Sequence, residues 1–179
     1  MSSQPPEPAT TSSTARLVLG IDPGTARLGY AVVRSERGAI SLVRGDVIST
    51  TPDRAMHMRL LEIHRALLEI IAETQPTEMA VEELFFAKNA TTAIGVGQAR
   101  GVALLTAAET GLSVSEYKPM QVKQAIHGYG LASKAQVGEM VRVLLRLVAP
   151  LRPDDAADAA AIAICHLHST HLGVSLSRS

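Results

Sequence analysis

Residues 17–25, LVLGIDPGT, place a carboxylate between an apolar run and a tight turn. The apolar run predicts a buried strand, and Pro-Gly followed by alternation at Tyr30 and Val32 predicts a hairpin. Asp22 ends this strand, where burying a carboxylate without compensation is costly. We therefore expect it to hold a cation or a hydrogen-bond network. The alternative is that Asp22 only caps the Pro-Gly turn as an Asx residue.

The length of 179 residues fits one domain with a single sizeable core, and the hydrophobic content of 46% argues against intrinsic disorder. We expect this domain over residues 15–172, between a flexible Ser/Thr/Pro/Gln-rich tail at 1–14 and a C-terminal tail at 173–179. The N-terminal residues lack the features of a signal peptide, and no apolar run is long enough to span a bilayer. The single cysteine, Cys165, fits a reducing compartment and predicts a cytoplasmic protein.

Charge is balanced in total but not along the chain. There are 17 basic and 17 acidic residues, which argues weakly against nucleic-acid binding. Residues 84–153, however, carry eight basic side chains and only three acidic ones, an excess of five positive charges. The basic residues are Lys88, Arg100, Lys118, Lys123, Lys134, Arg142, Arg146 and Arg152. The neutral total can therefore hide a basic face suited to phosphates.

The order of the predicted elements indicates an α/β architecture. Three β-rich runs, the last at 39–49, suggest an antiparallel meander. A helix is expected from Pro52-Asp53 to Pro76, then a strand at 78–81, a small-residue helix at 91–110 and a strand at 112–117. Further helices are expected at 119–126, 133–147 and 154–168. This order predicts one mixed sheet with helices on both faces.

The last of these helices begins with carboxylates that helix stability does not fully explain. Asp154 and Asp155 lie in its first turn, where acidic groups interact favourably with the helix dipole. Asp158 lies beyond that turn and shares a face with Asp155, on the side that continues to the apolar Ile162. Two carboxylates pointing into a sheet repel each other unless a cation lies between them. Asp154 and Asp158, at i and i+4, form a competing pair.

Glu82 supplies a further carboxylate at a strand end. It directly follows Ala80-Val81, whereas Glu83 is expected on the opposite face by strand alternation. Carboxylates from two strand ends and one helix start could converge on a hard divalent cation. Oxygen ligands favour Mg²⁺ or Mn²⁺ over Zn²⁺, and two such ions about 3.5–4 Å apart can promote phosphodiester hydrolysis.

Five segments in order along the chain carry a family resemblance. They are GIDPG (20–24), VEELFFAKNA (81–90), GQARG (97–101), QVKQ (121–124) and DAADA (155–159). Together they resemble the RuvC family of Holliday junction resolvases, the crossover junction endodeoxyribonucleases. The resemblance implies an RNase H-like fold, with three antiparallel strands followed by two parallel ones in a five-stranded mixed sheet flanked by helices. It also implies paired, symmetric, metal-dependent incision of four-way DNA junctions in homologous recombination and DNA repair.

Carried over position by position, the resemblance assigns site residues. Asp22, Glu82, Asp155 and Asp158 match the family's catalytic, metal-binding carboxylates, which implies Mg²⁺ or Mn²⁺, with two ions per site. The expected DNA-binding residues are Phe85, Lys88, Arg100, Lys123 and Lys134, with Phe85 as the aromatic that stacks on the junction. A homodimer is implied as well. A branch-migration helicase complex of the RuvA–RuvB type is a further candidate partner.

Several alternatives accompany these assignments. Exposed lysines are usually only solvated, and either Phe85 or Phe86 is expected in the core. Cys165, His166, His168 and His171 suggest zinc only weakly, because a second thiolate is missing. An actin-like nucleotide-binding domain would need a second lobe, and a junction-binding module without catalysis would not need four carboxylates. The glycines of 91–110 are expected to allow close backbone approach, either at a dimer interface or against the protein's own sheet.

Overall fold

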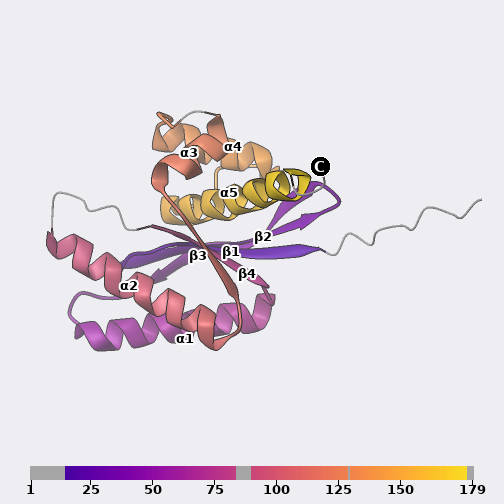
Figure 1. Ribbon diagram of the computed structural model, residues 1–179. Helices are drawn as coiled ribbons and strands as arrows, with labels where there is room; N and C mark the ends of the chain where they lie inside the picture. The colour runs from indigo at the N-terminus through magenta and orange to yellow at the C-terminus, as the bar shows by residue number, and fades with distance from the viewer. Residues whose placement is uncertain (1–14, 84–89, 129, 177–179) are drawn as a thin grey trace, which may run out of the picture.

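The computed structural model describes residues 15–83, 90–128 and 130–176, and their side chains except those of 90–92 and 170–176. A five-stranded sheet forms its centre, with helices on both faces (Figure 1). The strands are β1 (Arg16–Asp22), β2 (Arg27–Glu36), β3 (Ala39–Ser49), β4 (Glu78–Glu82) and β5 (Ser113–Tyr117). The helices are α1 (Met56–Thr74), α2 (Ala90–Glu109), α3 (Pro119–His127), α4 (Lys134–Leu144) and α5 (Asp154–Leu176).

The sheet has the strand order β3-β2-β1-β4-β5. Strands β1, β2 and β3 pair antiparallel, as the hairpin and the third run predicted. Strands β4 and β5 join them parallel, β4 beside β1 and β5 beside β4. The predicted mixed sheet of three antiparallel and two parallel strands is therefore confirmed. In the described part of the chain, no helix has both the length and the apolar character needed to cross a membrane.

The two faces of the sheet carry side chains of different size. Large apolar residues of the central strands, such as Leu19, Ile21 and Met79, form one core with α1 and α2. The other face carries small residues, including Gly20, and packs on α5 together with α3 and α4 (Figure 1). Strand alternation separates the two sets, since neighbouring residues point to opposite faces. The small face lets α5 lie unusually close to the sheet.

Two glycines set the position of α5. A Cβ atom built on Gly20 would lie 2.1 Å from the carbonyl oxygen of Ala159, and one built on Gly29 would lie 2.0 Å from that of Asp155. Neither position can hold a larger residue unless the helix backbone moves. Gly29 is also the cross-strand partner of Asp22. The first turns of α5 are thus pressed against β1 and β2 beside the end of β1.

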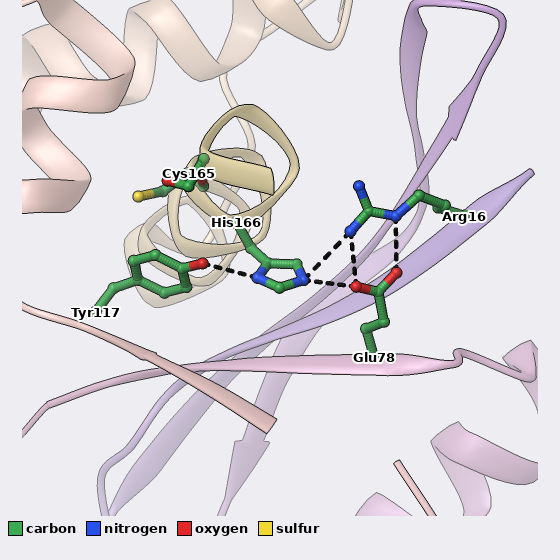
Figure 2. Close-up of polar contacts among 6 residues, drawn as sticks. Arg16, Glu78, Tyr117, Cys165 and His166 are labelled. Carbon is green, nitrogen blue, oxygen red and sulfur yellow. Dashed lines mark hydrogen bonds and ion pairs between the residues drawn. The ribbon is translucent and has the colours of Figure 1, made fainter. Parts of the chain in front are cut away.

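A partly buried polar network fixes the same helix further along (Figure 2). His166 of α5 has its Nδ1 atom 2.8 Å from the Tyr117 hydroxyl and its Nε2 atom 2.7 Å from Glu78 Oε2. Arg16 donates from Nε and Nη2 to the two oxygens of Glu78, at 2.8 and 2.6 Å. These hydrogen bonds hold the pKa of Glu78 down at about 2, Arg16 contributing most. The network ties α5 to the starts of β1 and β4 and to the end of β5.

The turn after Asp22 is held by an arginine of α1. Arg59 is buried and donates from Nε to Thr50 Oγ1 at 2.7 Å. The Thr50 hydroxyl in turn donates to the carbonyl of Thr25 at 2.6 Å. A buried guanidinium is tolerated here because it is hydrogen-bonded. Through Thr50, Arg59 therefore holds the turn that contains Thr25.

Several helix boundaries differ from those predicted. Helix α1 begins at Met56, because residues 52–54 form a turn instead of the expected first helical turn. Helix α4 ends at Leu144 instead of 147, and α5 continues to Leu176, well past 168. The predicted capping box at the start of α4 is confirmed, with Ser133 accepting from Gln136 N. The tail at 1–14, Phe85, Phe86 and Lys88 lie outside the described residues.

The glycines of α2 have different surroundings. A Cβ atom on Gly95 would lie 3.2 Å from Thr25 Oγ1, so this glycine accommodates the turn after β1. Gly101 is exposed, and a Cβ atom there would meet nothing within 4 Å. The alternative that Gly101 packs against the protein's own sheet is therefore wrong. Its free side points away from the fold.

Alanine substitutions at Gly20 and Gly138 test the close contact with α5. Gly20→Ala should destabilise the protein by about 1–3 kcal/mol, because its Cβ atom overpacks against the helix backbone. Gly138→Ala is the matched control, because a Cβ atom on this residue of α4 would meet nothing within 4 Å. It should be neutral or stabilise the protein by up to about 1 kcal/mol, as expected for a helix position with free space. Chemical denaturation measures both changes. Equal effects of the two substitutions would contradict the packing described here.

Candidate active site

The ends of two parallel strands bring Asp22 and Glu82 together. Strands β1 and β4 run side by side in register, with Ile21 opposite Val81. The next residue of each strand is therefore the carboxylate, and both carboxylates lie on the face that carries α5. Neither side chain is fully exposed or fully buried. The structure thus places Asp22 and Glu82 in one pocket at the ends of these two strands.

The start of α5 adds the other carboxylates. The contact of its backbone with Gly29 brings Asp155 next to the end of β1, and Asp158 follows one turn later. Asp158 lines a pocket with Asp22 and Glu82. Asp154 points elsewhere, since it is half exposed and pairs with Arg152. Of the two pairs that the sequence left open, Asp155 and Asp158 are the pair beside the sheet.

The pocket has a volume of about 200 Å³ and lies between the ends of β1 and β4 and the helices α3, α4 and α5. Its walls are acidic on the strand side and basic on the side of α3 and α4. The lining residues are Asp22, Glu82, Pro119, Val122, Lys123, Lys134, Val137, Asp158, Ala161 and Ile162. A pocket lined by both acidic and basic side chains can hold a cation and, next to it, a phosphate.

Crowding of carboxylates is visible in their proton affinities. Burial and, after it, the negative charges of Glu82, Asp158 and Asp155 together raise the pKa of Asp22 to about 7. Burial and the charge of Asp158 also raise the pKa of Glu82. Such shifts arise when the charged form lacks compensation by a nearby positive charge. Strongly perturbed carboxylates in a cleft are typical of functional sites.

Basic side chains compensate the two carboxylates of the helix. Arg27 Nη2 lies 2.8 Å from Asp155 Oδ2, and Lys134 Nζ lies 2.7 Å from Asp158 Oδ2. The hydrogen bond to Asp158 raises the pKa of Lys134. Within the described residues, no group of three or more His, Cys, Asp or Glu side chains is gathered closely enough to hold a metal ion. Asp155 and Asp158 are thus each paired with a basic side chain, Arg27 and Lys134 respectively.

The predicted DNA-binding residues fall into three groups. Lys123 and Lys134 line the pocket beside the carboxylates. Arg100 lies on α2 and pairs with Glu116. It is not among the residues that line the pocket. Phe85 and Lys88 lie outside the residues that the structure describes. Contact with DNA by any of these residues stays a prediction.

The zinc alternative does not find support in the described residues. His166 is engaged by Tyr117 and Glu78 (Figure 2). The Cys165 thiol is directed to the carbonyl of Gln121 at 3.8 Å. Burial raises the pKa of the Cys165 thiol, which disfavours the thiolate that zinc requires. The side chain of His171 is not described. Cys165 and His166 therefore contribute to the packing of α5.

Sequence reasoning missed two residues at the site. Arg27 begins β2 and pairs with Asp155, and Gly29 lets the helix approach Asp22. The sequence did carry a signal for Gly29. The first two predicted strands each contain a glycine near Asp22, namely Gly20 two residues before it and Gly29 at the start of the next strand. Arg27 carried no such signal, because its partner is more than a hundred residues away.

Comparisons with known proteins agree with this geometry. The family model described as "Crossover junction endodeoxyribonuclease RuvC" matches residues 18–166. A crossover junction endodeoxyribonuclease RuvC from Roseiflexus sp. (strain RS-1) is 53% identical over 156 residues, which cover 87% of this chain and 93% of that protein. These matches include both strand ends and the start of α5.

Solved structures are similar as well. The T. thermophilus RuvC in complex with a Holliday junction substrate superposes with a TM-score of 0.84 at 41% identity, covering 88% of this chain and 96% of that one. The yeast mitochondrial Holliday junction resolvase Ydc2 has a TM-score of 0.62 at 16% identity, covering 86% and 78% of the two chains. At that identity the second likeness concerns the fold alone.

The raised pKa of Asp22 predicts a pH-dependent gain from Asp22→Asn. The folded-state pKa of about 7 exceeds the usual 3.8, so stability linked to this proton is present below pH 4 and lost as the pH rises through 7. In EDTA, the variant should be more stable than the unmodified protein by up to about 4 kcal/mol at pH 8. The gain should vanish near pH 4.

Thermal unfolding across this pH range measures the effect. Asp154→Asn is the control, because Asp154 lies at the same helix start but is exposed and paired with Arg152. A gain for Asp22→Asn that does not change with pH, or a loss of stability at pH 8, would contradict the crowding of carboxylates.

Proposed function

The chain belongs to the RuvC family of crossover junction endodeoxyribonucleases, and we propose that it resolves four-way DNA junctions at the pocket bounded by Asp22, Glu82 and Asp158. Its activity as a Holliday junction endonuclease in recombination and repair follows from the family. The observation that carries the assignment of the site is the meeting of two strand-end carboxylates with the start of α5. An actin-like nucleotide-binding domain and a non-catalytic junction binder are the less favoured alternatives.

The donor set of the pocket fits Mg²⁺ or Mn²⁺. Asp22, Glu82 and Asp158 line the pocket and Asp155 lies beside it, and all four offer only carboxylate oxygens, which hard divalent cations prefer. The raised pKa of Asp22 indicates negative charge that a cation would relieve. We assign these four residues as ligands of two ions. When bound, such ions lower the pKa of water and stabilise charge on a phosphodiester.

The chain's own residues orient the DNA strand over this pocket. Lys123 and Lys134 line it, so their ammonium groups can contact the phosphates that flank the scissile bond. Glu82 and Asp22 are held rigidly, because each ends a strand of the central sheet. Asp155 and Asp158 are held by the contact of α5 with the glycines. Each acidic group therefore starts from a fixed position, which limits the reorganisation needed for reaction.

Removing single carboxylates tests this assignment. Asn at Asp22, Asp155 or Asp158, or Gln at Glu82, should lower the incision rate by roughly 10³-fold or more, since metal-assisted charge stabilisation is worth several kcal/mol. Junction binding should persist, because the loss of negative charge does not weaken phosphate contacts. Cleavage and gel-shift assays on one synthetic junction measure both properties. Asp154→Asn is the control and should stay active; a fully active Asp22→Asn enzyme would sink the assignment.

A homodimer is part of the proposal. Resolution of a junction with approximate two-fold symmetry needs two incisions, and a C2 dimer presents two sites in the matching relation. Helix α2 offers an exposed stripe at alternating spacings of four and three residues, typical of helix pairing. The stripe consists of Ile94, Gln98, Gly101, Leu105 and Ala108. Ile94 and Leu105 are 63% and 64% exposed, and Gly101 leaves room for another backbone.

A charged residue in the stripe should separate the protomers. Leu105→Arg should shift the protein from dimer to monomer at micromolar concentration, because the buried charge would lack a partner. Val143→Arg is the matched control, since Val143 is an apolar residue of α4 that is 51% exposed. Sedimentation equilibrium measures both. A monomeric unmodified protein with paired incision intact would rule the dimer out.

Two further assignments follow from the same premise. A helicase complex of the RuvA–RuvB type is proposed as the partner that delivers junctions. A DNA substrate and a single buried cysteine agree with action in the cytoplasm, where we place the protein.

A further inference from the structure

Three basic side chains line one open depression beside the acidic helix start. The depression has a volume of about 600 Å³ and is lined by Arg27, Lys134, Arg152, Pro153, Asp154 and Asp155. Its cations come from three elements: the start of β2, the start of α4 and the loop before α5. Each cation pairs with one acid of α5, namely Asp155, Asp158 or Asp154. Positive and negative charges are thus matched one to one.

Two of these acids are proposed ligands of the divalent ions. Arg27 and a metal ion therefore compete for the same carboxylate, Asp155, and so do Lys134 and a metal ion for Asp158. The pair of Arg27 and Asp155 is partly exposed, at 50% and 29% of the side chains. Ion pairs this exposed are weak, so the arginine can be released at little cost. A released guanidinium beside the pocket would find its best remaining partner in a phosphate.

We propose that Arg27 is a further phosphate-contacting residue of the nuclease site. Asp155 holds the Arg27 side chain until metal binds, and the released side chain then contacts the DNA backbone. This inference rests on the proposed metal site and deepens it. Arg27 lies two residues before Gly29, the cross-strand partner of Asp22, so it is close to the end of β1. Lys134 lines both the pocket and the depression, whereas Lys123 lines only the pocket and Arg27 only the depression. A DNA strand that crosses both hollows could thus contact all three side chains.

The exchange couples the two ligands of the site. Metal binding frees Arg27 for phosphate, and DNA binding removes the arginine that competes with metal. Each ligand must therefore raise the affinity of the other by the same factor. An arginine that only stabilises the fold through Asp155 would produce no such coupling. The substitution Arg27→Gln should accordingly change metal binding and DNA binding in opposite directions.

The first measurement is calorimetric titration of the free protein with Mn²⁺. Arg27→Gln should bind Mn²⁺ about 3- to 10-fold more tightly than the unmodified protein, because a positive charge next to Asp155 is removed. Arg44→Gln is the matched control. Arg44 is 44% exposed and pairs with Glu73 near the C-terminal end of α1, away from the pocket. Its substitution should leave Mn²⁺ binding unchanged.

The second measurement is junction affinity with and without Ca²⁺, with the DNA checked for incision. In Ca²⁺, Arg27→Gln should weaken binding and reduce the slope of log affinity against log salt by about one. Without a divalent ion the slope should be unaffected. Arg27→Lys keeps the charge and should restore the slope, whereas Arg44→Gln should resemble the unmodified protein throughout.

The outcomes separate this inference from the assignment beneath it. Unchanged or weaker Mn²⁺ binding by Arg27→Gln, or an unchanged salt slope in Ca²⁺, would overturn the role of Arg27. If the unmodified protein does not bind Mn²⁺, or Asp155→Asn binds it equally well, the metal site itself is wrong. Tighter Mn²⁺ binding together with the lower slope would support the exchange.

Discussion

The rest of the structure depends on how closely one helix approaches the sheet. Gly20 and Gly29 leave no room for a side chain between the strands and the backbone of α5. This contact decides which acids of the helix lie beside Asp22, and the strand register decides that Glu82 lies there too. The network around His166 fixes the helix at a second point, so that α5 can neither slide nor rotate easily (Figure 2).

The electrostatics of the site follow from this packing. Carboxylates from three elements are crowded at one edge of the sheet, which raises the pKa of Asp22 and Glu82. Crowding of like charges lowers the stability of the fold. Such crowding is typical of functional sites, and nearby opposite charges reduce its cost. Here the basic side chains Arg27 and Lys134 supply part of the compensation. In the proposed function, these same basic side chains would also contact the phosphate backbone of the DNA.

Patterns local in sequence predicted much of this arrangement. Strand alternation and the Pro-Gly turn were enough to place Asp22 at a strand end, and the i, i+3 spacing put Asp155 and Asp158 on one face. Contacts between distant segments were not predictable in this way. The burial of Arg59 under the Pro-Gly turn and the pairing of Arg27 with Asp155 depend on tertiary packing, which helical periodicity and charge counts do not contain. Helix ends such as that of α5 were missed because no proline or glycine marks them.

The central claim is the proposal that four neighbouring carboxylates bind divalent metal ions at one site. Anomalous diffraction from crystals soaked in Mn²⁺ tests it most directly, since it locates the metal without reference to activity. The account predicts anomalous peaks at about 2.0–2.3 Å from carboxylate oxygens of Asp22, Glu82, Asp155 and Asp158, as for hard cations on oxygen ligands. Peaks confined to other parts of the surface, with none between the strand ends and α5, would contradict it.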